Sequence, residues 1–506
     1  MNFAQFLEIH ARSDPAGLAT VDRRVRLSWL ELDQAANRFA NLLRARAVQP
    51  GDRVAIWLPN RVESVIAFLG AMKLGAIPAP LNWRLQSADL ARLVQHCQPE
   101  LLIGHDERVG MIDPLLAADR RLLVSDEARR GSFWAAIDQQ DARFASRACQ
   151  SDEIANLLYT SGTTAVPKAA VHTHGMRVAV AGAMADCFQL SRRDVGLAIS
   201  PLFHTSGLSV FSNCVFVGCP LVLLDRWDLA ELLAAIDRER VSFMHVIGTV
   251  VVDIVQAPAE AFASYSGRTM RFAWGGGHSL DHSTFERYEE RIGGVLLQGY
   301  SRTEGGLTYA RLQPEPGRFD NNGYPNRNSS DVAVLDSQSG RAMATGETGE
   351  IMVRGDGVSP GYWDGDYLRR PRLIDGSWYP TGDLGYYDQA GALHFLGRRD
   401  SMIKTGGENV YPAEVEAVLL AMPGVADAVV VGLSDPRLGQ RVGALLVRKD
   451  PALTAELVDR GCRAQLGGFK IPRTIGFVDA LPRLGSQKVD LAACRALLTA
   501  GAQQPI

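Results

Sequence analysis

The chain has 506 residues, with 53 Lys and Arg against 56 Asp and Glu, and 46% of its residues are hydrophobic. This composition excludes an intrinsically disordered or fibrous protein, and the length predicts several folding units, since domains average roughly 150 residues. The net charge of −3 gives no surplus of cations for nucleic-acid phosphates or anionic lipid headgroups, so we expect neither as a partner.

Residues 1–14 read as an amphipathic helix and lack the basic segment, apolar run and cleavage site of a signal peptide. The seven cysteines are an odd number without Cys-x-x-Cys spacing, which favours neither a disulfide framework nor a zinc site. The His172-x-His174 pair has no further metal ligand at useful spacing, so we interpret both as structural. These features predict a cytoplasmic protein.

Strand-like runs at residues 54–58 and 101–103 alternate with helix-like runs such as 62–74, which Gly75 should end. The alternation predicts an α/β fold. Residues 195–224 contain no Asp, Glu, Lys or Arg, and the segment is long enough to cross a bilayer. Because Pro, Gly and polar residues interrupt it, we predict buried strands and turns instead, and no membrane span.

The composition changes near residue 400, where a segment rich in Gly, Asp and Arg precedes a predicted helix at 413–421 and predicted strands at 428–431 and 443–447. We expect a large N-terminal domain of layered α/β subdomains over residues 1–396. Residues 397–400 would form a hinge, and residues 401–506 a small C-terminal α+β domain.

The sequence LYTSGTTAVPKAAVHTH at 158–174 carries the sharpest motif. An apolar strand leads into a loop whose hydroxyls and backbone N–H groups suit a phosphate chain, and Lys168 closes it. The loop residues are Thr160, Ser161, Gly162, Thr163 and Thr164. It is not a Walker loop, because Pro167 and Ala169 flank the lysine. Taken alone, the segment is also compatible with a solvated turn.

This loop resembles the phosphate loop of the adenylate-forming superfamily, which includes acyl-CoA synthetases, luciferase and the adenylation domains of peptide synthetases. Further segments occur in the family's order: PLFHTSGL at 201–208, WGGGHS at 274–279, QGYSRTE at 298–304, YPTGDLG at 379–385, GRRDSMIKTGGENVYPAEVE at 397–416 and PRLGSQK at 482–488. They extend over nearly the whole chain. The glycine runs do not fit a dinucleotide fingerprint, which argues against a dehydrogenase.

The resemblance implies roles for individual residues. Thr160 to Thr164 and Lys168 would hold the β- and γ-phosphates of ATP, Tyr300 would stack on adenine, and Thr303 would contact the α-phosphate. Glu304 would bind Mg²⁺, since a carboxylate suits a hard cation. Asp383 would accept from the ribose hydroxyls with help from Arg398. Lys488 would be the catalytic lysine that neutralises charge on the reacting groups.

The same resemblance implies an acyl site and a domain movement. His204 stands where the family often has an aromatic gate, and Gly275, Gly276 and Gly277 would form the wall between adenine and the acyl group. The small domain would be mobile, with its hinge at Asp400. After rotation, Gly406 and Gly407 would line a tunnel for the pantetheine arm of coenzyme A, since glycine lets a thin chain pass close to the backbone.

The implied function is an acyl-CoA ligase that converts a carboxylic acid through an acyl-adenylate to its CoA thioester. Several departures lie in ATP-handling segments: Ala165, Ala169, Ser301, Arg302 and Gln487. They raise a second possibility, an enzyme that forms thioesters from acyl-adenylate supplied by a separate adenylating enzyme. A non-catalytic adenylate-binding protein, a luciferase and a carrier-protein loader are further alternatives, which a thiol-acceptor assay separates.

The acid itself is weakly specified. Gly248 stands where relatives often carry Pro, and with Gly275 to Gly277 it predicts room for a bulky aromatic, alicyclic or polycyclic acid, unless Trp274 or other large side chains refill that room. We expect Arg302 to face solvent, with pairing to a second polar group of the acid as the alternative.

Overall fold

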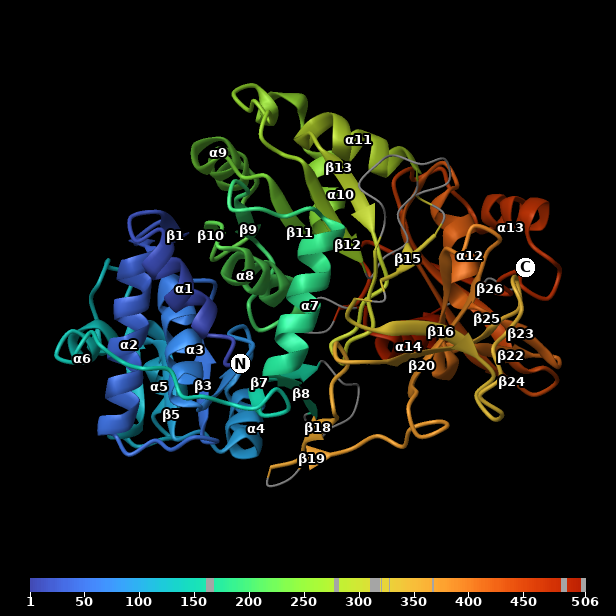
Figure 1. Ribbon diagram of the computed structural model, residues 1–506. Helices are drawn as coiled ribbons and strands as arrows, with labels where there is room; N and C mark the ends of the chain where they lie inside the picture. The colour runs from blue at the N-terminus through green and yellow to red at the C-terminus, as the bar shows by residue number, and fades with distance from the viewer. Residues whose placement is uncertain are drawn as a thin grey trace.

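The computed structural model describes residues 1–160, 168–276, 282–309, 319, 321–326, 328–365, 368–483 and 489–501. The chain forms a large N-terminal part, coloured blue to orange in Figure 1, and a smaller C-terminal part coloured orange to red. Both parts combine helices and sheets, which confirms the α/β prediction for a large domain followed by a small one.

The first subdomain is a parallel four-stranded sheet of order β4-β3-β5-β6. Its strands are β3 (Arg53–Trp57), β4 (Ile77–Pro80), β5 (Leu101–His105) and β6 (Arg121–Val124). Its helices are α2 (Trp29–Ala45), α3 (Val62–Leu74), α4 (Ser87–Cys97), α5 (Val109–Ile112) and α6 (Ser132–Ile137). Helix α3 has the predicted bounds because Gly75 takes the left-handed conformation, φ 89°, that ends a helix.

The second subdomain is a seven-stranded sheet in which all neighbours are parallel except β2. In sheet order its strands are β13 (Val295–Gln298), β12 (Phe272–Gly276), β11 (Phe243–Ile247), β9 (Gly196–Ala198), β10 (Leu221–Leu223), β1 (Leu18–Val21) and β2 (Arg26–Ser28). One face packs with α1 (Gln5–Ser13), α7 (His174–Cys187) and α8 (Thr205–Val217) into a core shared with α2 and α3. The other face is covered by α9 (Leu229–Glu239), α10 (Gly248–Gln256) and α11 (His282–Ile292) (Figure 1).

The prediction for residues 195–224 was wrong in part, because the charge-free segment contains α8 between strands β9 and β10. His204 caps the helix by accepting from the Ser206 N–H, and Gly218 at φ 84° ends it. The helix is apolar on most sides because it is buried between the two subdomains. In the part of the chain that the structure describes, no helix is long and apolar enough to cross a membrane.

Antiparallel sheets follow. One has the order β19-β18-β8-β7 and another the order β16-β17-β20-β21. Their bounds are β7 (Ile154–Thr160), β8 (Lys168–Thr173), β16 (Asp331–Leu335), β17 (Gly349–Arg354), β18 (Tyr362–Trp363), β19 (Leu368–Arg369), β20 (Tyr379–Tyr387) and β21 (Leu393–Arg398), with β14 (Thr308–Tyr309) and β15 (Tyr324–Pro325) as a separate pair. Short 3₁₀ turns are η1 (Asp106–Arg108), η2 (Ala118–Arg120), η3 (Ala259–Phe262) and η4 (Arg399–Ser401).

The C-terminal part has a five-stranded sheet, β23-β22-β25-β24 with β26 beside β25. Its elements are β22 (Ile403–Thr405), β23 (Glu408–Val410), α12 (Pro412–Leu420), β24 (Val425–Asp435), β25 (Gly439–Arg448), α13 (Ala455–Gln465), β26 (Thr474–Val478) and α14 (Leu491–Gly501). The predicted helix at 413–421 and both predicted strands are confirmed, and each strand extends several residues further at its ends. The domain bounds at residues 396 and 401 stay a prediction.

The first turn of α8 allows no side chain at Gly207. A β-carbon there would lie 2.2 Å from the Ser200 carbonyl oxygen and 2.4 Å from that of Pro201. We expect Gly207→Ala to lower the free energy of unfolding by about 1–3 kcal/mol, the usual cost of overpacking a core. Gly110→Ala is the control, since its helical β-carbon meets nothing within 4 Å. Denaturant unfolding checks both, and equal midpoints would contradict the packing argument.

Candidate active site

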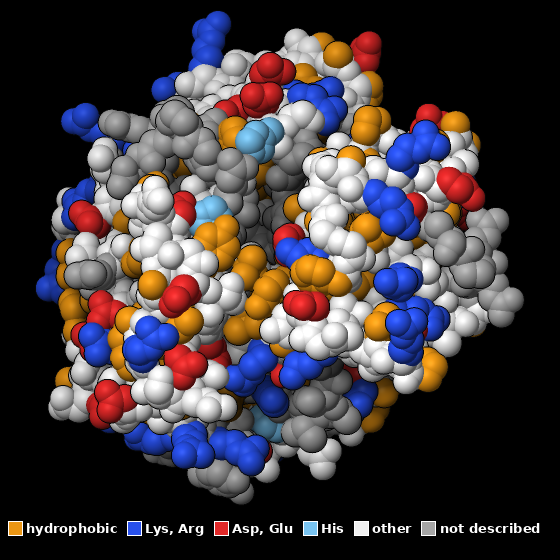
Figure 2. Space-filling view, turned by 90° about the vertical axis from the view of Figure 1, so that its right-hand side faces the viewer, with side chains coloured by type: hydrophobic (Ala, Val, Ile, Leu, Met, Phe, Trp, Pro, Cys, Tyr) orange, Lys and Arg blue, Asp and Glu red, His pale blue; other side chains and the backbone are white. Residues whose placement is uncertain are grey.

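The candidate site lies where the antiparallel sheets and the ends of the parallel strands meet. Thr160 ends β7 and Lys168 begins β8, and the Thr160 hydroxyl donates to the Lys168 carbonyl at 3.3 Å. These two residues therefore form the base of the predicted phosphate loop. Figure 2 shows that the face turned to the viewer is hollowed near its centre, with hydrophobic side chains along one edge of the hollow.

Two buried carboxylates dominate the site. Asp383 on β20 accepts a hydrogen bond from the Tyr300 hydroxyl at 2.7 Å, and the Tyr362 hydroxyl on β18 donates to Glu304. Burial and the Asp383 charge raise the pKa of the Tyr300 hydroxyl well above its ordinary value, so it stays a donor. The predicted ribose and metal residues thus each accept a hydrogen bond from a tyrosine hydroxyl.

Arg302 lies between these carboxylates. Its Nη2 is 3.5 Å from a Glu304 oxygen and its Nε is 3.3 Å from an Asp383 oxygen, and its side chain is only 9% exposed. The expectation that Arg302 faces solvent was therefore wrong. The sequence does not show the second partner, because Asp383 comes from a strand far along the chain. The guanidinium is buried because two carboxylates neutralise it there.

The region that joins the two parts of the chain approaches the same cluster. Arg398 ends β21 with its Nε 3.4 Å from Asp383, and its side chain is 65% exposed. Asp400 lies in the following 3₁₀ turn, where the neighbouring Arg399 pairs with the buried Glu350 at 2.9 Å. The predicted hinge therefore begins directly beside the predicted ribose carboxylate.

Gly406 and Gly407 form the turn between β22 and β23, with φ values of 60° and 91°. Left-handed backbone explains the glycines without any ligand. A β-carbon on Gly407 would meet nothing within 4 Å, so the turn is open on that side. The predicted contact with pantetheine stays a prediction.

Thr303 is held from two sides. Its carbonyl accepts from His172 Nε2 at 2.7 Å, and its hydroxyl accepts from the Thr205 hydroxyl at 3.2 Å. His172 Nδ1 accepts from Arg177 at 2.8 Å, which places the ring proton on Nε2. The buried Arg177 also donates to Asn156 and Ser212, at 2.8 and 3.0 Å. Sequence patterns did not reveal this chain of hydrogen bonds, because an arginine in a helix ordinarily indicates a surface charge.

The predicted acyl side surrounds the start of α8 and the ends of β11 and β12. His204 is exposed, and its Nδ1 lies 2.9 Å from the Ser206 hydroxyl. His245 in the middle of β11 is buried against the Trp274 ring, with its Nδ1 without a hydrogen-bond partner among the described residues. Gly275 is required by the sheet itself, since a β-carbon would lie 2.7 Å from the Val246 carbonyl oxygen.

Six predicted site residues lie outside the described residues: Ser161, Gly162, Thr163, Thr164, Gly277 and Lys488. Their roles stay predictions. Gly276 is the last residue of β12, so the chain reaches the predicted wall at the carboxyl end of a parallel strand.

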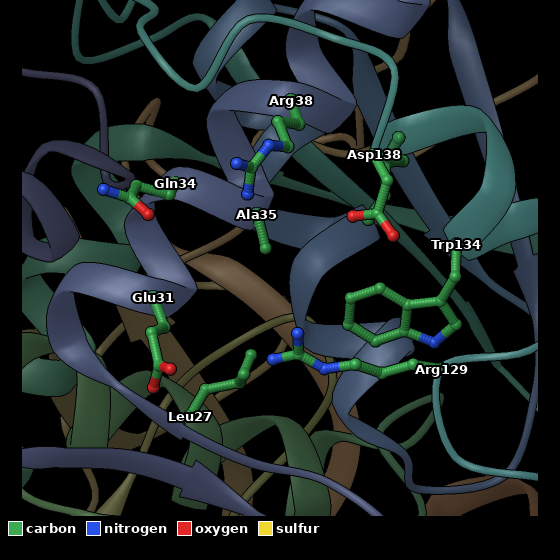
Figure 3. A pocket seen from close by; sticks show the side chains of 9 residues that line it. Leu27, Glu31, Gln34, Ala35, Arg38, Arg129, Trp134 and Asp138 are labelled. Atoms are coloured by element: carbon green, nitrogen blue, oxygen red, sulfur yellow. The ribbon is translucent and has the colours of Figure 1, made fainter.

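A separate cavity of about 150 Å³ lies between α2 and α6 (Figure 3). Arg38, Arg129, Glu31 and Asp138 line it with both signs of charge, and the Arg129 guanidinium lies 5.2 Å from the centre of the Trp134 ring. The elements around this cavity carry none of the motif residues. We therefore assign it no part in the site.

Comparison with known families gives two matches. Residues 7–363 match the model of the AMP-binding enzyme, and residues 414–488 match the AMP-binding enzyme C-terminal domain. A 2-succinylbenzoate–CoA ligase of Geobacillus kaustophilus (strain HTA426) is 34% identical over 491 residues, 96% of each chain. A methyl-dioxo-octahydroindenyl-propanoyl:CoA ligase of Rhodococcus jostii (strain RHA1) is 30% identical over 502 residues, 93% of this chain and 94% of the relative.

Solved structures agree. The crystal structure of ATP-bound MatB from Rhodopseudomonas palustris superposes with a TM-score of 0.88 at 28% identity and covers 99% of both chains. The chain belongs to the AMP-binding enzymes of the adenylate-forming superfamily. Within that superfamily it is an ATP-dependent acyl-CoA ligase, which uses ATP and coenzyme A with a carboxylic acid.

The buried histidines predict how stability depends on pH. Burial lowers the pKa of His172 and of His245 to about 3, with Arg177 adding to the shift at His172 and His204 at His245. In the unfolded chain each titrates near 6.5. The unfolded chain therefore binds more protons below that pH, and stability falls as the solution is acidified.

Between pH 7 and pH 5 each of these two histidines should lower the free energy of unfolding by about 2 kcal/mol, since the limiting slope is about 1.4 kcal/mol per pH unit. We expect His172→Gln to remove the contribution of His172 to this loss. The free energy of unfolding of the variant should therefore fall by about 2 kcal/mol less between pH 7 and 5 than that of the wild type. His394→Gln, which removes a histidine paired with Asp388 outside this network, is the control. Urea unfolding at several pH values checks this, and a parallel pH dependence in all three proteins would refute it.

Proposed function

We propose that the chain carries out both half-reactions of a CoA ligase on a bulky aromatic or alicyclic acid. In the first, a carboxylate oxygen of the acid attacks the α-phosphorus of ATP and pyrophosphate leaves. In the second, the sulfur of coenzyme A attacks the acyl carbon and AMP leaves. The observation that carries the proposal is the grouping of Tyr300, Glu304 and Asp383 around Arg302, with Thr303 adjacent in the chain, which brings the predicted nucleotide residues together.

Each residue has a role that its chemistry suits. Asp383 accepts only, and with Arg398 beside it the pair matches the two hydroxyl donors of a ribose. The ring of Tyr300 offers a face for adenine while its hydroxyl orients Asp383. Thr160 and Lys168 flank the phosphate loop, and Lys488 supplies positive charge to the reacting oxygens. His204 borders the acid, and Gly406 and Gly407 border the arm of coenzyme A, with Asp400 as the hinge between the two steps.

The buried Glu304 fits a magnesium ion. Its carboxylate offers hard oxygen ligands, and the phosphates of ATP would complete the coordination. Bound there, the ion would neutralise phosphate charge. Tyr362 holds the orientation of the carboxylate through its hydroxyl.

Two departures from the family pattern fit the fold without strain. Ala169 lies inside β8 opposite Tyr159 and Trp363, with ordinary strand geometry. Ser301 forms an isolated bridge with Leu307 and does not need positive φ. Glycine is therefore not required at either position, and this favours a complete adenylating half over an enzyme that depends on a separate source of acyl-adenylate. Ala165 and Gln487 lie outside the described residues.

Two assays test the proposal. ATP–pyrophosphate exchange should depend on the acid, and coenzyme A should then yield a thioester in stoichiometric ratio to AMP. A thioester formed from synthetic acyl-adenylate without any exchange would support the thioester-only alternative. Binding of adenylate with no acyl transfer to any thiol would indicate a non-catalytic adenylate-binding protein and sink the proposal.

The structure also predicts the effect of restoring a family glycine. We expect Ala169→Gly to leave the exchange rate within twofold and to lower the free energy of unfolding by roughly 1 kcal/mol, because glycine weakens a strand interior. Exchange kinetics and thermal unfolding measure the two effects. A severalfold faster exchange would show that Ala169 does impair adenylation.

Two relatives and the end of the parallel sheet support the proposed acid class. The relatives named above act on 2-succinylbenzoate and on an alicyclic propanoate. In this chain Gly248 is buried at the start of α10, beside the end of β11, and contributes no side chain there. A panel of aromatic, alicyclic and linear acids, scored by the rise in melting temperature with AMP present, should favour the first two classes.

A further inference from the structure

Arg302 is the buried charge that the family motif does not explain. Its side chain is 9% exposed, and its Nη1 has no hydrogen-bond partner among the described residues. A buried guanidinium donor without a partner costs free energy, so such donors normally have an acceptor. The missing acceptor therefore indicates a ligand.

The two carboxylates do not saturate Arg302. Both contacts, 3.3 Å to Asp383 and 3.5 Å to Glu304, are longer than the 2.7–2.9 Å that is typical of a charge-assisted hydrogen bond. The Nε contact with Asp383 also lacks hydrogen-bond geometry. Each carboxylate already accepts from a phenol, Asp383 from Tyr300 and Glu304 from Tyr362. The guanidinium is thus held near both acids and the Tyr379 hydroxyl, while its Nη1 keeps no hydrogen-bond partner among the described residues.

The charge of Arg302 is secure. A guanidinium stays protonated in proteins, and here two carboxylates lie beside it. A permanently charged fork with a spare N–H group matches a phosphate better than a neutral polar group of an acid.

We propose that Arg302 binds the phosphate attached to the ribose of the nucleotide, through its unpartnered Nη1. This rests on the proposed function, because Asp383 is taken as the ribose ligand and Thr303, the next residue, as a phosphate ligand. Arg302 stands between Asp383 and Glu304, so the phosphate that links ribose to the metal end would lie within its reach. Arg302 is then a nucleotide ligand as well as the counter-ion of two acids.

The test compares AMP with adenosine, which differ only in that phosphate. Calorimetry without divalent metal gives the affinity of AMP, and displacement of AMP gives that of adenosine. We expect Arg302→Met to weaken AMP at least tenfold and adenosine less than threefold. Arg302→Lys keeps a cation between the acids and should fold as the wild type, with an intermediate loss for AMP because lysine lacks the fork.

Arg354→Met is the matched control, since Arg354 pairs with Asp331 on an exposed edge and should leave both affinities unchanged. Equal weakening of AMP and adenosine would overturn the inference. A wild-type AMP affinity in Arg302→Lys would overturn it too, because it would show that Arg302 only neutralises Glu304 and Asp383 and holds no phosphate through its fork. Failure to form a CoA thioester would refute the proposed function instead, while a selective loss of AMP would still support the phosphate contact.

Discussion

Two carboxylates that share one guanidinium set the constraint on which the rest of the site depends. Glu304 and Asp383 are both buried, and their mutual repulsion at low dielectric would be severe without Arg302. The shared cation lets two acids with separate tasks stand close together in a dry environment. Each acid also accepts from one phenol, Asp383 from Tyr300 and Glu304 from Tyr362, so this cluster is a preformed polar surface with acceptor sites left for a ligand.

The fold supports this cluster from several directions. Strand β20 supplies Asp383, the segment after β13 supplies Tyr300 to Glu304, and β18 supplies Tyr362. His172 on β8 fixes the backbone of Thr303, and Arg177 on α7 fixes His172. Because each support comes from a packed helix or strand, the orientation of the site follows from the core and does not need separate loops to hold it.

The sequence predicted several local features correctly but did not predict contacts between distant residues. The bounds of α3 could be predicted because Gly75 adopts the left-handed conformation that ends a helix. The C-terminal strands could be predicted from their apolar runs. Helix α8 was missed because a helix buried on most sides lacks amphipathic periodicity. The contacts of Arg302 and His172 were missed for a different reason: Asp383 and Thr303 are distant from them in sequence, and side-chain type alone does not tell which charges the fold will bury.

The hydroxyl contact between Thr205 and Thr303 links regions that the motifs treat as separate. Thr205 begins the helix next to the predicted acid pocket, and Thr303 belongs to the predicted nucleotide segment. An acid that shifts the first turn of this helix therefore also shifts the position of the nucleotide segment. By thermodynamic reciprocity, a bound nucleotide changes the relative affinities of the site for different acids. Selectivity in such an arrangement is a joint property of both ligands, fixed by their mutual coupling energy.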